Sequence, residues 1–306
     1  MTLGIHGGRN YPELELTEFE VPGFEVQAFC KVGTRHRKKG QATQDAIGHQ
    51  TDAARRQTLF VVNDGVGSHR DSDLVAELHV EETLKHFATG ASRISANKLQ
   101  ALHRLTQIEL YRGVWRSTEI HHGSTVAALA LAHENGLVHI NTIGDIEIAR
   151  QTAVNVENQR NGWHSPAHTR LYPENGSLFE WRRNHDTNHR LAGFLQAQCN
   201  KNADRSRLLC PTGGDARITN SVVRKFTPPF PPNAKVSMAY SIPPHPSVSL
   251  RMAQGDILVV TSDGAGLYGY SHAIENEQNP DLIRILTELG PELTRDDFSG
   301  YVLQKT

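Results

Sequence analysis

The sequence has only three cysteines, at Cys30, Cys199 and Cys210, and they lie far apart along the chain. Three separated cysteines cannot build a disulfide framework, so we expect a protein of a reducing compartment, the cytoplasm. An excess of one charge is also missing, because 32 Lys and Arg residues face 33 Asp and Glu residues. Nucleic-acid binding needs an excess of cations, so we expect no nucleic-acid partner.

Long hydrophobic runs are absent as well. The longest, Val126–Ala132, is too short to cross a bilayer, and the first 25 residues carry glutamates in place of a signal peptide. We therefore expect no membrane partner. The 306 residues, 38% of them hydrophobic and 21% charged, are typical of a folded globular protein.

Short β-branched or alternating runs predict strands along much of the chain. The first segment, to about residue 25, is polar and rich in turns, and we predict no strand there. Apolar residues at helical spacing predict two consecutive helices, over about 72–90 and 94–113, and a further one over 282–289. The predicted strands cover 26–32, 59–63, 126–132, 137–143, 146–149, 247–252, 256–261 and 301–304. Strands and paired helices in this order favour an α+β fold with antiparallel sheets.

Residues 153–235 are rich in Asn, Arg, His and Pro and have weak periodicity. We predict a single domain over 1–306 with this variable segment embedded in it. Two histidine pairs in the segment have the i, i+4 spacing of zinc ligands, but no Cys-x-x-Cys accompanies them. The alternative is an elaborated flap beside the active site.

Two predicted strands end in the same dipeptide, Asp64-Gly65 and Asp263-Gly264. Strand ends of this kind would place two carboxylates at one edge of a sheet, and hard divalent cations prefer such oxygen ligands. For either dipeptide alone, a simple hairpin turn is an equally good interpretation.

Six motifs in order together resemble the metal-dependent protein phosphatases, the type 2C or PPM family, and in particular a bacterial branch. They span roughly residues 26 to 304, apart from 153–235. The matching segments are Gly33-Thr34-Arg35-His36 with Gln44-Asp45-Ala46, Val61 to His69 around Asp64-Gly65, Gly123-Ser124-Thr125, Ile143-Gly144-Asp145, Thr261-Ser262-Asp263-Gly264, and Arg295-Asp296-Asp297-Phe298-Ser299.

The resemblance implies a fold and a metal site. The fold would be a four-layer α-β-β-α sandwich of two antiparallel sheets flanked by helix pairs. Two Mn²⁺ or Mg²⁺ ions would be held by Asp64 as the bridge, the Gly65 carbonyl, Asp263 and Asp296, with Asp45 acting mostly through water. Asp145 would lie behind the ligands, and Asp297, an extra acid beside Asp296, would either be a ligand or lie behind the ligands too.

The chain departs from many relatives at the position that binds the substrate phosphate, where His36 replaces an arginine. The loop that follows contains Arg37, Lys38 and Lys39, which would supply positive charge beside His36, or would form only a solvated basic turn. Val66 stands where eukaryotic members have a histidine, so the general acid is unassigned. Leu267 replaces an acid of the third metal site, so we expect two ions.

The function implied by the resemblance is a protein serine/threonine phosphatase that acts on phosphoserine and phosphothreonine through a metal-bridged hydroxide. Asp64, Asp263 and His36 would be its catalytic residues, and phosphorylated proteins and an opposing serine/threonine kinase would be its partners. Two alternatives stay open. One is a catalytically weak phosphoprotein-binding or regulatory module of the same fold, and the other is a phosphatase of small esters or phosphotyrosine.

Overall fold

The computed structural model describes a core of two β-sheets and one long helix. The described residues are 4–65, 67, 70–90, 98, 99, 101–103, 105, 106, 109, 119, 120, 122–143, 146–151, 169, 170, 195–199, 208–211, 223–226, 247–262, 264 and 296–306.

The described strands form two sheets, and every strand pair in them is antiparallel, as predicted. The nine-stranded sheet contains β1 (Gly4–Gly7), β4 (Ala46–Asp52), β5 (Gln57–Gly65), β6 (His122–His133), β7 (Leu137–Ile143), β10 (Leu195–Cys199), β11 (Leu208–Pro211), β12 (Val223–Phe226) and β13 (Ser247–Arg251). The six-stranded sheet has the order β2 (Leu14–Val21), β3 (Phe24–Lys31), β15 (Phe298–Lys305), β14 (Ile257–Thr261), β8 (Glu147–Gln151) and β9 (Thr169–Arg170).

Strand β5 explains the layering, because successive side chains of a strand point to opposite faces. Phe60 and Val62 belong to the core between the two sheets, where they pack with residues of β3, β14 and β15. Leu59 and Val61 belong to a second core on the outer face of the larger sheet. A strand that is buried on both faces needs apolar side chains at every position, and β5 has them from Leu59 to Val62.

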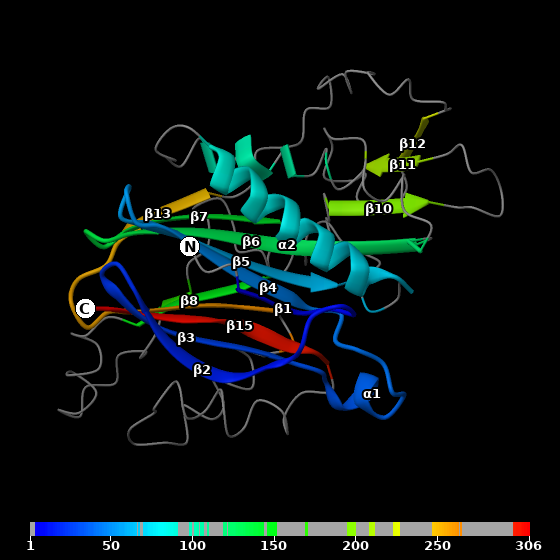
Figure 1. Ribbon diagram of the computed structural model, residues 1–306, viewed down its shortest axis with the longest axis horizontal. Helices are drawn as coiled ribbons and strands as arrows, with labels where there is room; N and C mark the ends of the chain where they lie inside the picture. Colours follow the sequence, from blue (N-terminus) through cyan, green and yellow to red (C-terminus); the bar gives the residue numbers. More distant parts are fainter. Residues whose placement is uncertain are drawn as a thin grey trace.

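The helix α2 (Ser72–Thr89) covers that outer face (Figure 1). Its Ala76, Val80, Leu84 and Phe87 recur at helical spacing and pack on Leu59 and Val61. Leu99 and Leu102 join the same core, and the described residues between 98 and 109 are helical, within the predicted second helix. The structure therefore shows three of the four predicted layers. The helix predicted over 282–289 lies outside the described residues.

The N-terminal region differs from the prediction. Residues predicted to be turn-rich form β1 and β2, and residues 46–52 form β4. These strands escape the sequence pattern because β1 is short and contains two glycines, while β2 is an edge strand with four glutamates or threonines among its eight residues. No helix among the described residues is long and apolar enough to cross a membrane.

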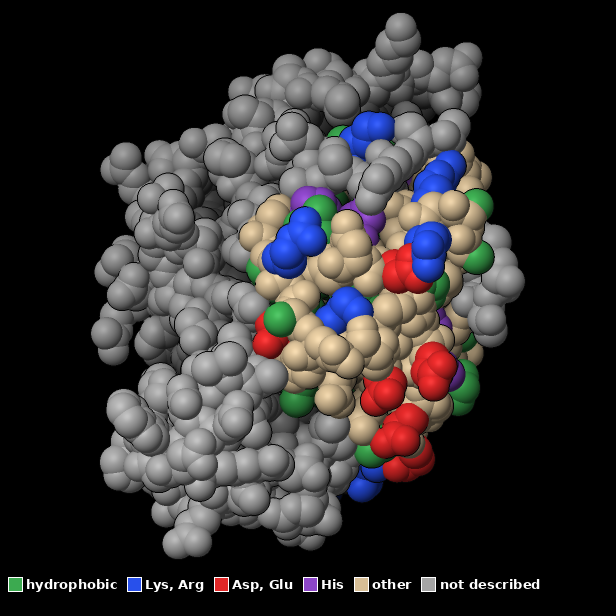
Figure 2. Space-filling model, turned by 90° about the vertical axis from the view of Figure 1, so that its left-hand side faces the viewer, with side chains coloured by type: hydrophobic (Ala, Val, Ile, Leu, Met, Phe, Trp, Pro, Cys, Tyr) green, Lys and Arg blue, Asp and Glu red, His purple; other side chains and the backbone are tan. Residues whose placement is uncertain are grey.

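Charge is distributed unevenly over the described surface. Figure 2 shows the end of the molecule that carries the C-terminus, and acidic side chains gather there on one part of the face. Glu18 and Glu20 of β2 and Glu25 of β3 are exposed acids. The short helix α1 (Thr34–Arg37) lies at the opposite end (Figure 1).

Candidate active site

The end of β5 carries the first candidate ligands, Asp64 and Gly65. Asp64 is half-buried, and the hydroxyl of Thr125 on β6 donates to its backbone carbonyl at 2.9 Å. Gly65 is tightly enclosed, because a Cβ there would lie 2.4 Å from the Gln44 carbonyl oxygen and 3.0 Å from Ser72 Cβ. Only glycine fits this position, so the backbone of the two neighbouring segments holds the proposed carbonyl ligand in place.

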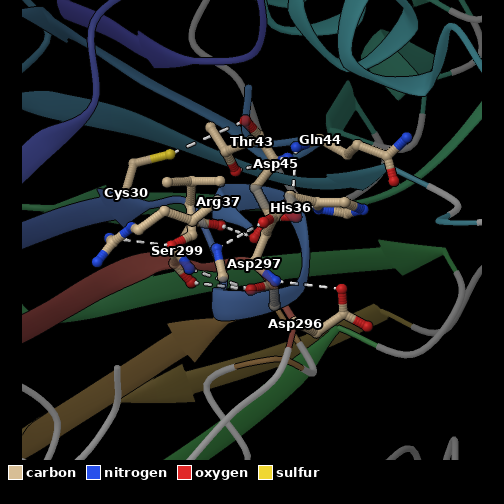
Figure 3. Close-up of polar contacts among 12 residues, drawn as sticks. Cys30, His36, Arg37, Thr43, Gln44, Asp45, Asp296, Asp297 and Ser299 are labelled. Atoms are coloured by element: carbon tan, nitrogen blue, oxygen red, sulfur yellow. Dashed lines mark hydrogen bonds and ion pairs between the residues drawn. The ribbon is translucent and has the colours of Figure 1, made fainter. Parts of the chain in front are cut away.

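Asp45 comes directly before β4, the neighbour of β5. The pairing of Ala46 with Asn63 places Asp45 and Asp64 at the next positions along the two strands. Asp45 is 1% exposed, and its carboxylate accepts a 2.8 Å hydrogen bond from the hydroxyl of Ser299 on β15. Because β15 belongs to the other sheet, this bond joins the two sheets at the edge where the carboxylates lie (Figure 3).

Asp297 fixes the loop that follows Gly33. Its buried carboxylate accepts hydrogen bonds from the Gly33 amide at 2.7 Å, the His36 ring Nδ1 at 2.8 Å and the Gln44 amide at 2.5 Å (Figure 3). The hydrogen bond with Asp297 is the main cause that raises the pKa of His36, so the ring favours its cationic form. One side chain thus holds both ends of the 33–44 loop and the histidine between them.

Asp296, next to this anchor, is exposed. A Cβ at Gly33 would lie 2.2 Å from the Asp296 carbonyl oxygen, so the backbones of the first and last motifs are in direct contact. Ser262, which precedes Asp263, pairs with Ser299 of β15, since the Ser262 amide donates to the Ser299 carbonyl at 2.9 Å. Gly264 packs on the Asp297 backbone as well. The residues flanking Asp263 therefore contact the segment that contains Asp297 and Ser299.

The structure also shows a turn at the N-terminus that the sequence analysis missed. The Gly8 amide donates to the Asp45 carbonyl at 2.7 Å, so this turn holds the backbone of a candidate ligand. Arg9 forms a two-pronged ion pair with Asp73 at 2.8 and 3.0 Å. The Asn10 side-chain amide donates to the Glu77 carboxylate at 2.7 Å, and the Tyr11 hydroxyl donates to the Glu81 carboxylate at 2.6 Å. The four-residue spacing of Asp73, Glu77 and Glu81 on one helix face was the signal in the sequence.

A second feature missed from the sequence is a buried polar pair behind Asp64. The Asn63 amide donates at 2.8 Å to the carbonyl of Ala76 in α2 and contacts the His79 ring. Burial lowers the pKa of His79 well below its usual value, so this histidine is neutral. Asn63 therefore ties the end of β5 to α2 one residue before Asp64.

The candidate donors suit a hard divalent cation, because they are carboxylate oxygens and a peptide carbonyl, without sulfur or imidazole. Within the described part of the chain, no three His, Cys, Asp or Glu side chains alone form a metal-binding group. The predicted ligand Asp263 and the predicted second-shell residue Asp145 lie outside the described residues. The structure brings Asp45 and Asp64 to adjacent strand ends and joins Asp45 to the segment that follows Asp296.

A two-sheet α+β sandwich with carboxylates at one edge is the architecture of metal-dependent phosphatases. A protein-family model described as Protein phosphatase 2C matches residues 32–211. The chain belongs to the protein phosphatase 2C family, whose members are metal-dependent protein phosphatases, and this confirms the resemblance found in the motifs.

Comparison with solved structures shows the same fold. The chain is similar to the serine/threonine phosphatase Stp1 from Staphylococcus aureus, with 16% identity, a TM-score of 0.59, and coverage of 96% of this chain and 99% of that one. It is also similar to the S. agalactiae serine/threonine phosphatase, with 14% identity, a TM-score of 0.55, and coverage of 92% and 100%. The catalytic domain of PstP, solved with two manganese ions, has 13% identity, a TM-score of 0.53, and coverage of 92% and 97%. No curated protein sequence matches the chain.

Proposed function

We propose that this chain hydrolyses phosphoserine and phosphothreonine in proteins at the edge formed by Asp45, Asp64 and Asp296, with Asp263 as a further ligand. The observation that carries the proposal is the junction of the two sheets. The Ser299–Asp45 hydrogen bond holds the Asp45–Asp64 strand ends against the segment that starts at Asp296.

The residues present suit two Mn²⁺ or Mg²⁺ ions. Asp64 would hold both ions, the Gly65 carbonyl would add an oxygen donor to one of them, and Asp45 would act mostly through a bound water. Asp263 and Asp296 would complete the ligands of the other ion. When bound, the ions would supply Lewis acidity and an activated water for attack on phosphorus. Manganese is present in the solved structure of the relative PstP, which supports this choice of cation.

The chain's own groups would bind and orient the phosphate. His36, Arg37 and Lys39 stay the predicted phosphate-binding residues. Of these, His36 is 4% exposed and held by Asp297, the Arg37 guanidinium donates to the Val32 carbonyl at 3.2 Å, and Lys39 is exposed. Because Asp297 fixes the loop at three points, we propose that it positions the residues of the site. We propose that Asp145 likewise lies behind the metal ligands.

The proposal extends to the whole chain and its partners. We propose one phosphatase domain over 1–306 with the variable segment at 153–235 embedded in it, acting in the cytoplasm on phosphorylated proteins and opposing a serine/threonine kinase. Cys30, a buried free thiol, is in keeping with a reducing compartment.

The test is phosphate release from a phosphothreonine peptide, a phosphotyrosine peptide and an aryl phosphate, each with Mn²⁺, with Mg²⁺ and with a chelator. We expect metal-dependent release from the phosphothreonine peptide. Release from phosphotyrosine alone would contradict the substrate class, and binding of the phosphopeptide without any release would establish the regulatory module instead.

A further inference from the structure

The turn around α1 presents an unusual concentration of cations. Four of its residues are basic and exposed, whereas the side chain of His36 in the same turn is buried. The exposed cations are Arg35, Arg37, Lys38 and Lys39. Among the described residues, Arg35, Lys38 and Lys39 make no ion pair, whereas Arg9 at the N-terminal turn pairs with Asp73.

The backbone of this turn is rigidly held, although the side chains of Arg35, Lys38 and Lys39 are exposed. The Arg37 amide donates to the Gly33 carbonyl at 2.9 Å and the Lys38 amide to the Thr34 carbonyl at 3.2 Å. The amides of Lys39 and Gln41 both donate to the His36 carbonyl, at 2.9 and 3.1 Å. With Asp297 holding Gly33, His36 and Gln44, the whole turn is anchored to the protein.

A rigid group of like charges without internal counter-ions lowers the cost of binding an anion, because little backbone order has to be created on binding. Arg35 and Lys38 lie three positions apart, so they share the outward side of the turn. They also lie close to the candidate ligands, because His36 between them is bonded to the residue that follows Asp296.

We infer that Arg35 and Lys38 form a specificity surface for phosphoprotein substrates with acidic side chains beside the phosphorylated residue. The inference rests on the proposed function, since the turn would bind the residues on either side of the phosphorylated residue while its phosphate lies at the metal site. A peptide is favoured over nucleic acid because the chain as a whole has a net charge of −1, and this group of cations occupies only one short turn.

The experiment measures the binding and turnover of two fluorescent phosphothreonine peptides that differ only in their flanks, Glu-Glu on each side or Gln-Gln on each side. We expect the acidic peptide to bind about tenfold tighter at low salt, with the difference in kcat/KM arising from KM and shrinking as salt is added. In the double variant Arg35→Gln with Lys38→Gln, this preference should be lost, so that the ratio of the affinities for the two peptides falls to about one.

The matched control removes two cations elsewhere. Arg56→Gln with Lys85→Gln causes the same change of net charge at exposed residues whose ion pairs with Glu134 and Glu82 are far from the turn in sequence. This control should keep the preference. Equal affinity of the parent for both peptides, or a preference that survives Arg35→Gln with Lys38→Gln, would overturn the inference.

Binding by fluorescence anisotropy needs no turnover, so its outcome is separate from that of the proposed function. Acidic preference in binding without phosphate release would support the surface and contradict the enzyme. Release from both peptides and from an aryl phosphate, without acidic preference, would support the enzyme and contradict the surface. Equal competition by a single-stranded RNA of matched charge would show a general anion surface and overturn the peptide class.

Discussion

Two turns contact the candidate ligands, and their cations have different partners. In the N-terminal turn, residues 7–12, the guanidinium of Arg9 faces inward onto Asp73, and Gly8 binds the backbone of Asp45. In the α1 turn, residues 33–44, the buried His36 faces inward onto Asp297, while Arg35, Lys38 and Lys39 face solvent. The first turn uses its charge to hold the strand ends together. The second uses one charge as an anchor and leaves the others available for substrate.

The largest effect is expected when the anchor of the α1 turn is removed. Asp297→Ala deletes three accepted hydrogen bonds and leaves the buried His36 ring without its carboxylate partner. Breaking a buried pair in this way costs about 3 kcal/mol of unfolding free energy. We expect kcat/KM on a phosphopeptide to fall by about 10- to 100-fold, because the loop beside the site is no longer positioned.

Asp256→Ala is the control for this change. Asp256 is also buried, and its carboxylate accepts a 3.0 Å hydrogen bond from Ala253, beside the C-terminal strand. This variant should lose stability and keep its kcat/KM. Should Asp297→Ala lose stability but keep kcat/KM just as this control does, the anchor would be structural only.

A smaller effect is expected from the N-terminal turn. Arg9→Gln breaks the pair with Asp73, but 44% of the Arg9 side chain is exposed, so solvent screens the charge. We expect a loss of about 1 kcal/mol in a denaturant titration. The preference for acidic peptides should not change, in contrast to Arg35→Gln with Lys38→Gln. A changed peptide preference in Arg9→Gln would show that the two turns do not differ in role.

A fall in pH should destabilise the core, which contains buried histidines, more than the two turns. Burial lowers the pKa of His49 and of His103 to about 4, whereas an unfolded histidine titrates near 6.5. The folded-state pKa is depressed for a base, so the unfolded chain binds more protons between these two values. Stability is therefore full above about pH 6.5 and falls as the pH drops toward 4, by about 3 kcal/mol for a fully buried histidine.

Unfolding free energies at pH 7.5 and pH 5.5 would test this. The parent should be less stable at the lower pH, and His49→Phe, which retains a ring against Phe19, should lose less. We expect the effect of Arg9→Gln on the unfolding free energy to be the same at both pH values. Equal stability of the parent at both pH values would contradict the account.

The sequence was sufficient for the central elements because their signals are local. The apolar run before Asp64 predicted β5, and the spacing of Val80, Leu84 and Phe87 predicted α2, which the structure confirms. The edge strand β2 was missed because its glutamates face solvent and only part of its alternation is apolar. Pattern analysis detects burial, and an edge strand is buried on one face at most.

The contacts around the site were harder to predict because they join distant parts of the chain. Asp297 meets His36 across 261 positions, and Arg9 meets Asp73 across 64. The motifs identified Asp297 as an outer residue, but only the fold shows that it accepts hydrogen bonds from both ends of the 33–44 loop. Likewise, the basic residues after His36 were visible in the sequence, while the division into one buried anchor and several exposed cations was not.

The central claim is that Asp64 holds a pair of divalent ions that drive phosphate release. Asp64→Asn keeps the size of the side chain and removes its charge, so we expect calorimetry to show at least one Mn²⁺ lost and phosphopeptide hydrolysis reduced by orders of magnitude, with the fold retained. Asp52→Asn, which alters a surface pair with Arg55, should keep both the ions and the activity. The account would be contradicted if the parent protein shows Mn²⁺-stimulated phosphate release and the Asp64→Asn variant still binds Mn²⁺ and releases phosphate at a similar rate.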